Sequence, residues 1–524
     1  MDDNDYDSIP ASFRCIAGRY HDKQAIRCGG RRIDYGELDR ASDRVAAGLA
    51  ERGIGKGDRV ALYCINSELF VFAYLGILKA GATVVPINLL LNPREIEYIL
   101  NDAEAKALIY HQAFSENVEA FLAGVTGLAF CVHMGESPLE GHVPWEVLIA
   151  TCAPVPEPCF DAAEDVASIL YTSGTTGKPK GAMLTHRNLL SDCGGVIEAL
   201  QVRAGEDVFL VVLPMFHAFA ATVGLLTPLL RGCSLLPVPR FEPALVLDTI
   251  AEGGATIFLG VPSMYNVLLQ LPEEQVAKFA PVRFCVSGGA AMPQELMKKF
   301  EQRYGKLIYE GDGPTECGPV TCVNPIGGVR KPASVGLPIP GVEMSIRDSR
   351  GEPLPDNEIG EICVRGDNVM KGYWKRPEAT AESFWGSWFR TGDLGYRDED
   401  GYFYIVDRIK DLIIVNGMNV YPRVVEEVLY QHPAIREAAV VGEPSESHGE
   451  IPVAYVALHE GAQADGSEIR RFCREHLGRH EVPRKVFFLP ELPKNAAGKI
   501  LKRELRKQGE LERGVDSRRP ESVN

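Results

Sequence analysis

The sequence lacks the features that would indicate a zinc site, a disulfide framework or a surface for nucleic acid. Its 13 cysteines form no Cys-x-x-Cys pair. Scattered thiols in a reducing cytoplasm are therefore expected. The net charge is −16, which argues against nucleic acid as a partner, because such binding depends on neutralising phosphates. A few local lysines can still attract a small anionic substrate into a cleft.

Long apolar segments are also scarce. The first ten residues, MDDNDYDSIP, are acidic and do not resemble a signal peptide, so a cytoplasmic location is expected. The uncharged run 209–230 has the length of a membrane span, but Pro214, His217 and Pro228 divide it. We predict a buried strand, a turn and a core helix there, and no transmembrane segment. Peripheral membrane contact is an alternative, but no basic amphipathic helix supports it.

What the sequence does contain is an alternation of strand-like and helix-like runs from about residue 33 to 400. A strand pattern at 57–66 is followed by a helix pattern at 67–81 and a second strand pattern at 82–88. This order predicts an α/β fold with mostly parallel strands. The runs 256–262 and 283–290 both contain glycine near their ends, so a ligand crevice is expected at the carboxyl ends of these strands.

The pattern of predicted elements changes after about residue 340, where short strands alternate with turns. A chain of 524 residues is too long for one core. We therefore predict a large N-terminal domain, 1–406, made of layered α/β sheets plus a small β-barrel-like portion. A small mobile α+β domain, 407–508, should follow. The polar tail, 509–524, is expected to be disordered.

The stretch YTSGTTGKPKG, residues 171–181, follows the apolar strand pattern 166–170 directly. It combines hydroxyl groups, exposed backbone amides at glycines, and two lysines. Those groups together suit a polyphosphate. The glycine spacing is not that of a Walker A loop or a dinucleotide fingerprint. An ordinary surface turn is the alternative interpretation.

This stretch closely resembles the phosphate-loop signature of the adenylate-forming superfamily, which includes acyl-CoA synthetases, luciferases and the adenylation domains of peptide synthetases. Further family motifs follow in the family's order: LPMFHAFA (213–220), SGGA (287–290), GPTE (313–316), RTGD (390–393), DRIKDLIIVNGMNVYP (407–422) and PKNAAGK (493–499). The resemblance covers nearly the whole chain. It implies that a carboxylic acid attacks the α-phosphate of ATP, and that CoA then takes the acyl group from the adenylate.

The resemblance also implies a nucleotide site. Its residues would be Thr172, Ser173, Gly174, Thr175, Thr176, Gly177, Lys178, Lys180, Gly288, Gly289, Ala290, Asp312, Gly313, Asp393 and Arg408. The loop would hold the β- and γ-phosphates. Asp393 would accept hydrogen bonds from both ribose hydroxyls, and Arg408 would add positive charge nearby. A turn aspartate is the alternative reading of Asp393.

The catalytic roles are implied in the same way. Lys499 would bridge the carboxylate and the α-phosphate and so relieve the repulsion between two anions. Thr315 would contact the α-phosphate, and Glu316 would hold Mg²⁺, which prefers oxygen ligands. His217 would gate the acyl site. The alternatives are an exposed surface lysine at 499 and a core histidine at 217.

The resemblance also implies that two residues of the small domain take part in a domain rotation. Lys410 marks the hinge about which that domain would rotate between the two half-reactions. In the second pose, Gly417 would line the tunnel for the thiol, since glycine permits close approach of the backbone. A plain turn glycine is the alternative at this position.

One position departs from the family pattern. Asp312 stands where the family usually has an aromatic residue that stacks on adenine, and such stacking contributes about 1–3 kcal/mol per base. We hypothesise that Asp312 accepts a hydrogen bond from the adenine amine. The alternative is that Asp312 points elsewhere and that Gly289 and Ala290 suffice.

Within the superfamily, the segments NGMNVYPRVVEEVL and YEGDGPTECGPVTCVNP look most like bacterial long-chain fatty-acid–CoA ligases. The expected acyl pocket comprises Phe216, Ala218, Phe219, Val223, Val261 and Met264. No charged residue in 209–230 could pair with a substrate ammonium, so an amino acid is disfavoured.

We therefore expect a medium- to long-chain fatty acid–CoA ligase that uses ATP, Mg²⁺ and CoA, with a homodimer as one expected assembly. The alternatives are an aryl or alicyclic acid–CoA ligase, transfer to a carrier protein, and a non-catalytic protein that has kept the fold.

Overall fold

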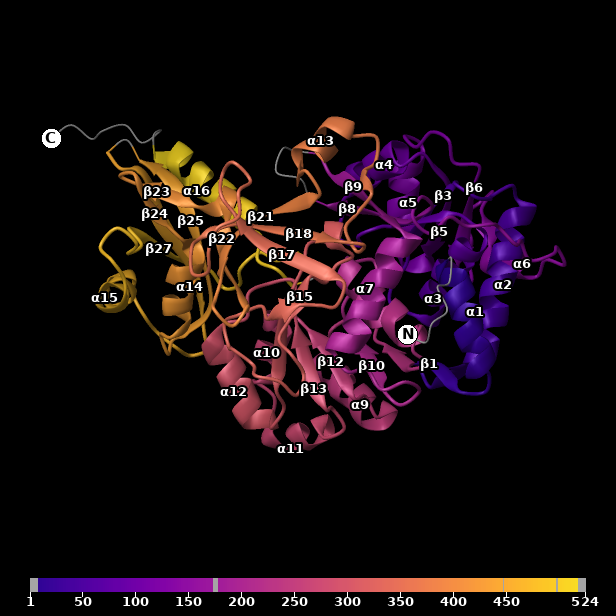
Figure 1. The fold of residues 1–524 in the computed structure, drawn as a ribbon, viewed down its shortest axis with the longest axis horizontal. Helices are drawn as coiled ribbons and strands as arrows, with labels where there is room; N and C mark the ends of the chain where they lie inside the picture. The colour runs from indigo at the N-terminus through magenta and orange to yellow at the C-terminus, as the bar shows by residue number, and fades with distance from the viewer. Residues whose placement is uncertain (1–7, 173–177, 446, 496–497, 517–524) are drawn as a thin grey trace.

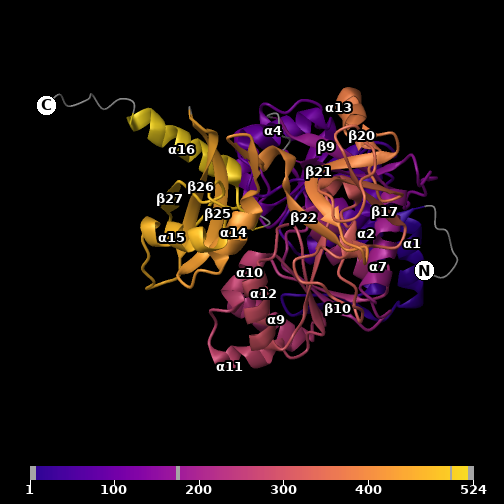
Figure 2. The same ribbon diagram turned by 60° about the vertical axis from the view of Figure 1, so that its left-hand side comes forward.

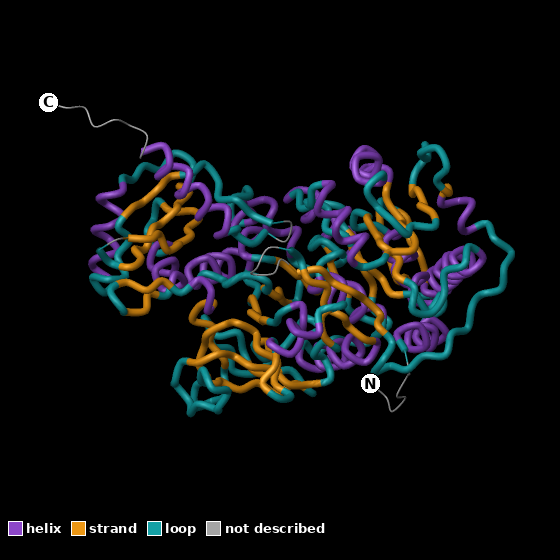
Figure 3. Tube along the Cα trace, turned by 90° about the horizontal axis from the view of Figure 1, so that it is seen from above, coloured by secondary structure: helices purple, strands orange, loops and turns teal. Residues whose placement is uncertain are grey.

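The fold consists of two sheets rich in parallel strands, an antiparallel sheet beside them, and a separate small α+β domain (Figure 1). The computed structural model describes residues 8–172, 178–445, 447–495 and 498–516. The predicted class, a large α/β domain with a barrel-like portion and a small C-terminal domain, is confirmed. Seen from above, the strands of the small domain form a group apart from those of the large domain (Figure 3).

The first large sheet has eight strands in the order β19-β9-β8-β4-β3-β5-β6-β7. The strands are β3 (Arg59–Tyr63), β4 (Thr83–Pro86), β5 (Ala105–His111), β6 (Phe130–Met134), β7 (Val143–Pro144), β8 (Val166–Thr172), β9 (Lys180–Thr185) and β19 (Gly372–Tyr373). Most pairs are parallel, but β8 and β9 pair antiparallel. The phosphate-loop stretch therefore connects two adjacent strands at one end of this sheet.

The second large sheet has nine strands in the order β16-β15-β14-β13-β12-β10-β11-β1-β2. They are β1 (Gln24–Cys28), β2 (Arg31–Asp34), β10 (Val208–Val211), β11 (Ser234–Pro237), β12 (Ile257–Gly260), β13 (Phe284–Ser287), β14 (Ile308–Asp312), β15 (Cys322–Val323) and β16 (Leu337–Pro338). Because β12, β13 and β14 run parallel, their carboxyl ends meet at one edge. The glycines at the ends of β12 and β13 lie there, as the sequence predicted.

Helices pack around and between these sheets. They are α1 (Ile9–Arg19), α2 (Tyr35–Glu51), α3 (Glu68–Lys79), α4 (Pro93–Asp102), α5 (Ser115–Leu122), α6 (Trp145–Ile149), α7 (His186–Ala199), α8 (Thr227–Leu229), α9 (Pro243–Gly253), α10 (Pro262–Leu268), α11 (Glu273–Val276), α12 (Gln294–Tyr304) and α13 (Pro377–Glu382). Helix α7, which lines the site described below, begins with a capping box at Thr185 and Asn188. This cap satisfies backbone donors that the first turn leaves unpaired.

The uncharged run 209–230 forms a buried strand, a turn and a buried helix, as predicted. Strand β10 leads into a π-helix at Ala220–Leu226, which continues into α8. The π form, with its wider turns, was not predicted, because it depends on packing rather than on composition. Among the described helices, none combines the length and the apolar character needed to cross a membrane.

The antiparallel sheet contains β17 (Val342–Arg347), β18 (Gly360–Gly366), β20 (Phe384–Trp385), β21 (Trp388–Arg397) and β22 (Phe403–Arg408). The small domain contains β23 (Ile413–Val415), β24 (Met418–Val420), β25 (Ile435–Ser445), β26 (Gly449–Leu458), β27 (Lys485–Phe488), α14 (Pro422–Tyr430), α15 (Gly466–His476) and α16 (Lys502–Asp516). Figure 2 shows the small domain in yellow beside α10 and α12 of the large domain.

Helix α16 corrects one boundary. We predicted a disordered tail from residue 509, but the helix extends to Asp516. Its anchor is Leu505, which is fully buried in a cluster with Val441 and Tyr455 of the neighbouring strands.

Candidate active site

The loop after β8 and the GPTE motif come together in space. The Thr172 hydroxyl Oγ1 donates to Glu316 Oε1 at 3.5 Å, and the Tyr373 phenol donates to the same oxygen at 2.8 Å. The Lys180 ammonium lies over the Tyr373 ring, 5.1 Å from its centroid. Ser173, Gly174, Thr175, Thr176 and Gly177, which were also predicted to hold phosphate, lie outside the described residues.

Glu316 has the chemistry of a ligand for a hard cation. The hydrogen bonds that it accepts from Thr172 and Tyr373 both fall on Oε1, which leaves Oε2 for an ion. Burial and the Glu316 charge raise the pKa of Tyr373, so its phenol stays protonated and donates. Among the described residues, no three acidic, histidine or cysteine side chains cluster as a metal site of their own. An Mg²⁺ ion shared between one carboxylate and nucleotide phosphates fits this arrangement.

Asp393 and Arg408 are directly opposed on the antiparallel strands β21 and β22. The Arg408 Nε donates to Asp393 Oδ1 at 2.7 Å, and the Asp393 side chain is almost completely buried. The Asp393 charge raises the pKa of Arg408. The arginine therefore compensates a buried carboxylate and orients it, which suits a residue that must accept two hydroxyl hydrogen bonds.

The turn that carries Lys499 is docked against the large domain. Gly498 has a φ of +78°, and a β-carbon there would lie 2.6 Å from Ser263 Oγ and 2.9 Å from Val261 Cγ2. Asn495 holds the turn closed, because its side-chain oxygen accepts from the Lys499 backbone N–H at 2.9 Å. The pose of the small domain thus places this motif at the start of α10.

Lys499 lies close enough to several charged groups of the large domain to change their titration. Its own side chain is exposed to the cleft, yet the walls of the cleft remove enough water to lower its pKa, and the Arg408 charge lowers it further. Asp393 and Asp312 act in the opposite direction. Burial and the Lys499 charge together lower the pKa of His217 to about 4. Lys499, Asp393 and His217 therefore share one cleft.

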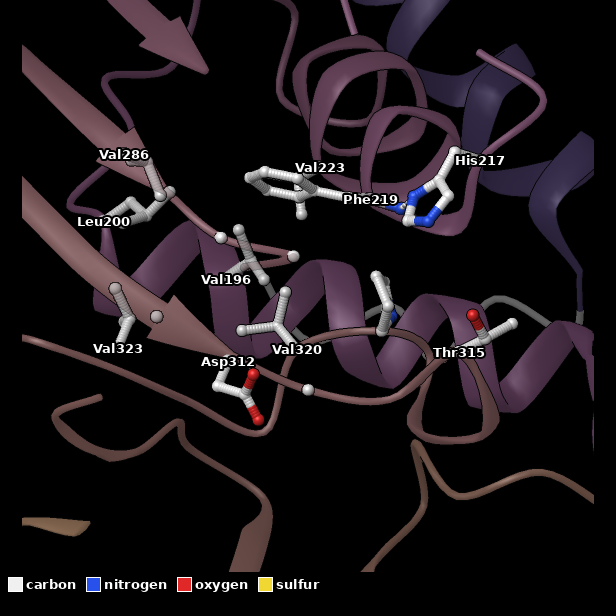
Figure 4. Close-up of a pocket in the computed structure, with 15 residues that line it drawn as sticks. Val196, Leu200, His217, Phe219, Val223, Val286, Asp312, Thr315, Val320 and Val323 are labelled. Carbon is white, nitrogen blue, oxygen red and sulfur yellow. Dashed lines mark hydrogen bonds between the residues drawn. The ribbon is translucent and has the colours of Figure 1, made fainter. Parts of the chain in front are cut away.

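An adjoining pocket opens beside these groups (Figure 4) and contains about 560 Å³ of empty space, counting its open mouth. It is lined by Val196, Leu200, His217, Phe219, Val223, Val286, Gly288, Gly289, Gly311, Asp312, Gly313, Thr315, Pro319, Val320 and Val323. Its polar side chains are His217, Asp312 and Thr315. Figure 4 shows the Asp312 carboxylate directed away from the apolar side chains. The apolar interior formed by these described residues therefore offers no charged partner to a guest.

The predicted acyl residues are only partly those that line this pocket. Phe219 and Val223 line it, whereas Phe216, Ala218, Val261 and Met264 are buried but are not among its lining residues. Two side chains of the predicted segment therefore line this pocket, and its use as an acyl site stays a prediction. Likewise, Gly288, Gly289 and Gly313 line the pocket and Ala290 does not.

Several lining residues were missed because they come from other elements. Val196 and Leu200 are four apart at the end of α7, a spacing that puts both on one helix face. Val320 and Val323 follow the GPTE motif, Val320 just before strand β15 and Val323 at its end. The i, i+4 pair was visible in the sequence, but nothing there indicated that α7 crosses this site.

The two residues assigned to motion lie apart from each other. Lys410 follows β22 in a short 3₁₀ turn, where burial and the Arg408 charge lower its pKa. Gly417 forms the exposed tip of the β23–β24 hairpin, with a φ of +79°. A β-carbon at this tip would meet no atom of the described residues within 4 Å. This pose therefore presents Lys499, and not Gly417, to the cleft.

Comparisons with known proteins agree with this geometry. The family model described as "AMP-binding enzyme" matches residues 13–374, and "AMP-binding enzyme C-terminal domain" matches 424–499. A long-chain-fatty-acid–CoA ligase from Bacillus subtilis (strain 168) is 37% identical over 521 residues, which cover 93% of this chain and 92% of that protein. A feruloyl-CoA synthase from Amycolatopsis sp is 37% identical over 485 residues, which cover 92% of this chain and 95% of that one.

Solved structures extend the likeness to three dimensions. The anthranilate CoA ligase AuaEII, in complex with anthranoyl-AMP, superposes with a TM-score of 0.91 at 31% identity. That match covers 97% of this chain and 98% of the other. A benzoate CoA ligase from Burkholderia xenovorans LB400 has a TM-score of 0.87 at 30% identity, with 95% and 99% covered.

Proposed function

Since this chain belongs to the AMP-binding enzyme family and is an AMP-forming acid–thiol ligase, we propose that its substrate is a fatty acid of medium to long chain. The observation that carries this proposal is the pocket beside Lys499. Its interior side chains are valine, leucine and phenylalanine, and such walls favour an alkyl chain through burial of apolar surface. The relatives are named for fatty, aryl and other acids, so an aryl or alicyclic acid is the second candidate.

In the proposed first half-reaction, the substrate carboxylate attacks the α-phosphorus of ATP and pyrophosphate leaves. Lys499 stands between the two anions and lowers the cost of their approach. Thr315, at the pocket wall, contacts the α-phosphate, while Thr172, Lys178 and Lys180 hold the outer phosphates. The magnesium ion, held by Glu316, would neutralise charge on the leaving pyrophosphate.

In the proposed second half-reaction, the CoA thiol attacks the acyl carbonyl and AMP leaves. The small domain rotates about Lys410, so that Lys499 withdraws and the hairpin around Gly417 reaches the site. The support is the arrangement of the small domain, which carries both segments and exposes the hairpin tip in the present pose. Transfer to a carrier protein would use the same rotation with a different thiol.

We also propose that Asp312 contacts the nucleoside by accepting a hydrogen bond from the adenine amine. Asp312 lies at the pocket edge beside Gly288 and Gly289, and its carboxylate points out of the apolar interior. Burial, and then the negative charge of Asp393, raise its pKa to about 6. A cationic or amine donor from a bound nucleoside would offset the repulsion between Asp312 and Asp393.

The proposed function is tested by pyrophosphate release from ATP and Mg²⁺ with acetate, octanoate, palmitate, oleate, benzoate and cyclohexanecarboxylate, each with and without CoA. We expect the highest kcat/KM with octanoate or a longer chain, and turnover that requires CoA. A maximum at benzoate or cyclohexanecarboxylate would replace the fatty acid with a ring acid. Turnover that CoA does not affect would instead favour a carrier-protein acceptor.

A further inference from the structure

A second cavity lies between the large and the small domain, away from the nucleotide site. It contains about 680 Å³ of empty space, counting its open mouth, and is lined by Asn266, Leu269, Gln270, Glu295, Leu296, Lys299, Tyr430, Ile435, Arg436 and His459. It shares no residue with the pocket of Figure 4. Its walls come from α10 and α12 on one side and from α14, β25 and the end of β26 on the other. Figure 2 shows these helices beside one another.

Three basic side chains, Lys299, Arg436 and His459, line this interdomain cavity. Its carboxylate, Glu295, is already paired with Lys298 at 2.9 Å. Within the described part of the chain, no acidic group forms an ion pair with any of the three. The cavity therefore carries positive charge that the surrounding described residues do not neutralise.

Arg436 has an unused donor at this place. Its Nη2 donates to the Pro490 carbonyl at 2.7 Å, while its Nε is buried and has no hydrogen-bond partner among the described residues. A buried donor without a partner is costly, because it has lost its water. His459 responds to the same surroundings, since burial and the charges of Lys299 and Arg436 lower its pKa. The unpartnered Arg436 donor is what a site for an anion would provide.

We propose that the interdomain cavity binds a phosphate dianion, either free inorganic phosphate or the phosphomonoester of a larger solute such as the 3′-phosphate of CoA. Guanidinium and ammonium groups are the side chains that recognise phosphate. A single carboxylate would supply less negative charge than Lys299 and Arg436 together can balance. The side-chain amides of Asn266 and Gln270 provide additional neutral donors at the wall.

Occupancy of this cavity is coupled to the pose of the small domain. Lys299 belongs to the large domain, whereas Arg436 and His459 belong to the small one, so the site is complete only when the two face each other. In the present pose the Asn266 side chain also donates to the Arg436 carbonyl at 3.4 Å. An anion that binds the assembled site must stabilise this pose relative to any other. The pose it stabilises is the one that presents Lys499 to the cleft.

Direct binding is tested on the full chain labelled with ¹³C at histidine Cε1, with the His459 resonance assigned from a His459→Gln variant. Potassium phosphate is titrated against potassium chloride at equal ionic strength. We expect a saturable shift of the His459 signal and a rise of its pKa as phosphate binds. A His459 signal that does not respond, or that responds equally to chloride, would overturn the proposal. Phosphate bound near the loop at 172–180 would not move this signal.

Matched variants assign the effect to the cavity. Arg436→Gln and Lys299→Gln should each weaken phosphate binding about tenfold or more, because each removes a charged hydrogen bond. Lys299 is exposed, so its variant keeps the test valid if Arg436→Gln folds poorly. Lys278→Gln removes a lysine that pairs with Asp248 outside the lining of the cavity, so it should leave the affinity unchanged. Equal affinity in the wild type and Lys299→Gln would also contradict the proposal.

Comparison of CoA with dephospho-CoA identifies the source of the phosphate. If the 3′-phosphate is the ligand, CoA but not dephospho-CoA will shift the His459 signal; if free phosphate is the ligand, neither will.

The coupling between phosphate binding and the pose of the small domain rests on the proposed function, and a separate kinetic experiment measures it. Phosphate should slow acyl transfer to dephospho-CoA several-fold while sparing pyrophosphate release, and Lys299→Gln should remove that inhibition. A chain without ligase activity would sink the proposed function but leave the binding result intact.

Discussion

The guanidinium of Arg408 donates to the carboxylate of Asp393 across the paired strands β21 and β22, with Nε 2.7 Å from Oδ1. Arg408 is also the second residue before Lys410, where the small domain is proposed to turn. One ion pair therefore joins the proposed ribose contact to the proposed hinge. Protein groups alone hold this geometry, so the carboxylate need not be ordered when a nucleotide binds.

Removing this pair should weaken the use of ATP. In Arg408→Gln we expect the KM for ATP to rise about tenfold or more, because Asp393 stays buried but loses a charge-assisted hydrogen bond. Steady-state kinetics over a range of ATP concentrations measures the change. Arg397→Gln is the control. Arg397 lies on β21, the strand of Asp393, and forms a surface ion pair with Asp356. A similar KM in Arg408→Gln and the wild type would contradict this role.

Lys499→Ala should abolish the first half-reaction and leave the fold intact. We expect at least a hundredfold loss in the rate of pyrophosphate release, about the size typical of losing one electrostatic contact to a transition state. The side chain is exposed, so the melting temperature should not change. Lys507→Ala, at an exposed position of α16, should retain full activity. A normal burst of pyrophosphate from Lys499→Ala would show that the lysine is not catalytic.

The raised pKa of Asp312 predicts that the free energy of unfolding depends on pH. Its pKa of about 6 lies above the unfolded value of about 3.9, so the folded protein holds this proton more tightly. Between about pH 4 and 6 its ionisation therefore lowers the free energy of unfolding as the pH rises. We expect Asp312→Asn to be more stable than the wild type at about pH 7.5, by about 1–2 kcal/mol after allowance for solvent contact.

Denaturant unfolding at about pH 7.5 and about pH 4 measures this difference, which should vanish at the lower pH. The same gain at both pH values would mean that the carboxyl charge is not the cause. Asp312→Asn should also narrow the preference for ATP over GTP, if the proposed hydrogen bond to the adenine amine exists. An unchanged preference would count against that contact and leave the stability prediction standing.

Leu200, at the end of α7, should control the length of acid that the pocket accepts. Leu200→Phe fills part of the space that Val196 and Val323 also line, and it should lower kcat/KM for palmitate about tenfold while octanoate changes less. Leu200→Ala enlarges the same space and should shift the preference toward longer chains, at a stability cost of about 2–5 kcal/mol. Competition between palmitate and octanoate reports both shifts. Parallel losses for the two acids would show that Leu200 does not contact the chain.

Local sequence patterns predicted those helices and strands whose bounds depend on the properties of nearby residues. Pro214 and Pro228 divide the uncharged run into a strand and a helix, because proline cannot continue either element freely. The π form of Ala220–Leu226 and the extension of α16 to Asp516 were not predicted. Both depend on partners that are distant in the chain.

The sequence by itself determined the chemistry of this protein. Through their resemblance to family motifs, the segments that contain Thr172, Glu316, Asp393 and Lys499 predict a phosphate loop, a metal carboxylate, a ribose carboxylate and a mobile cation. Only the tertiary structure decided the recognition surfaces. The pocket of Figure 4 and the interdomain cavity are built from side chains on separate strands and helices, and periodicity cannot show which faces of those elements will meet.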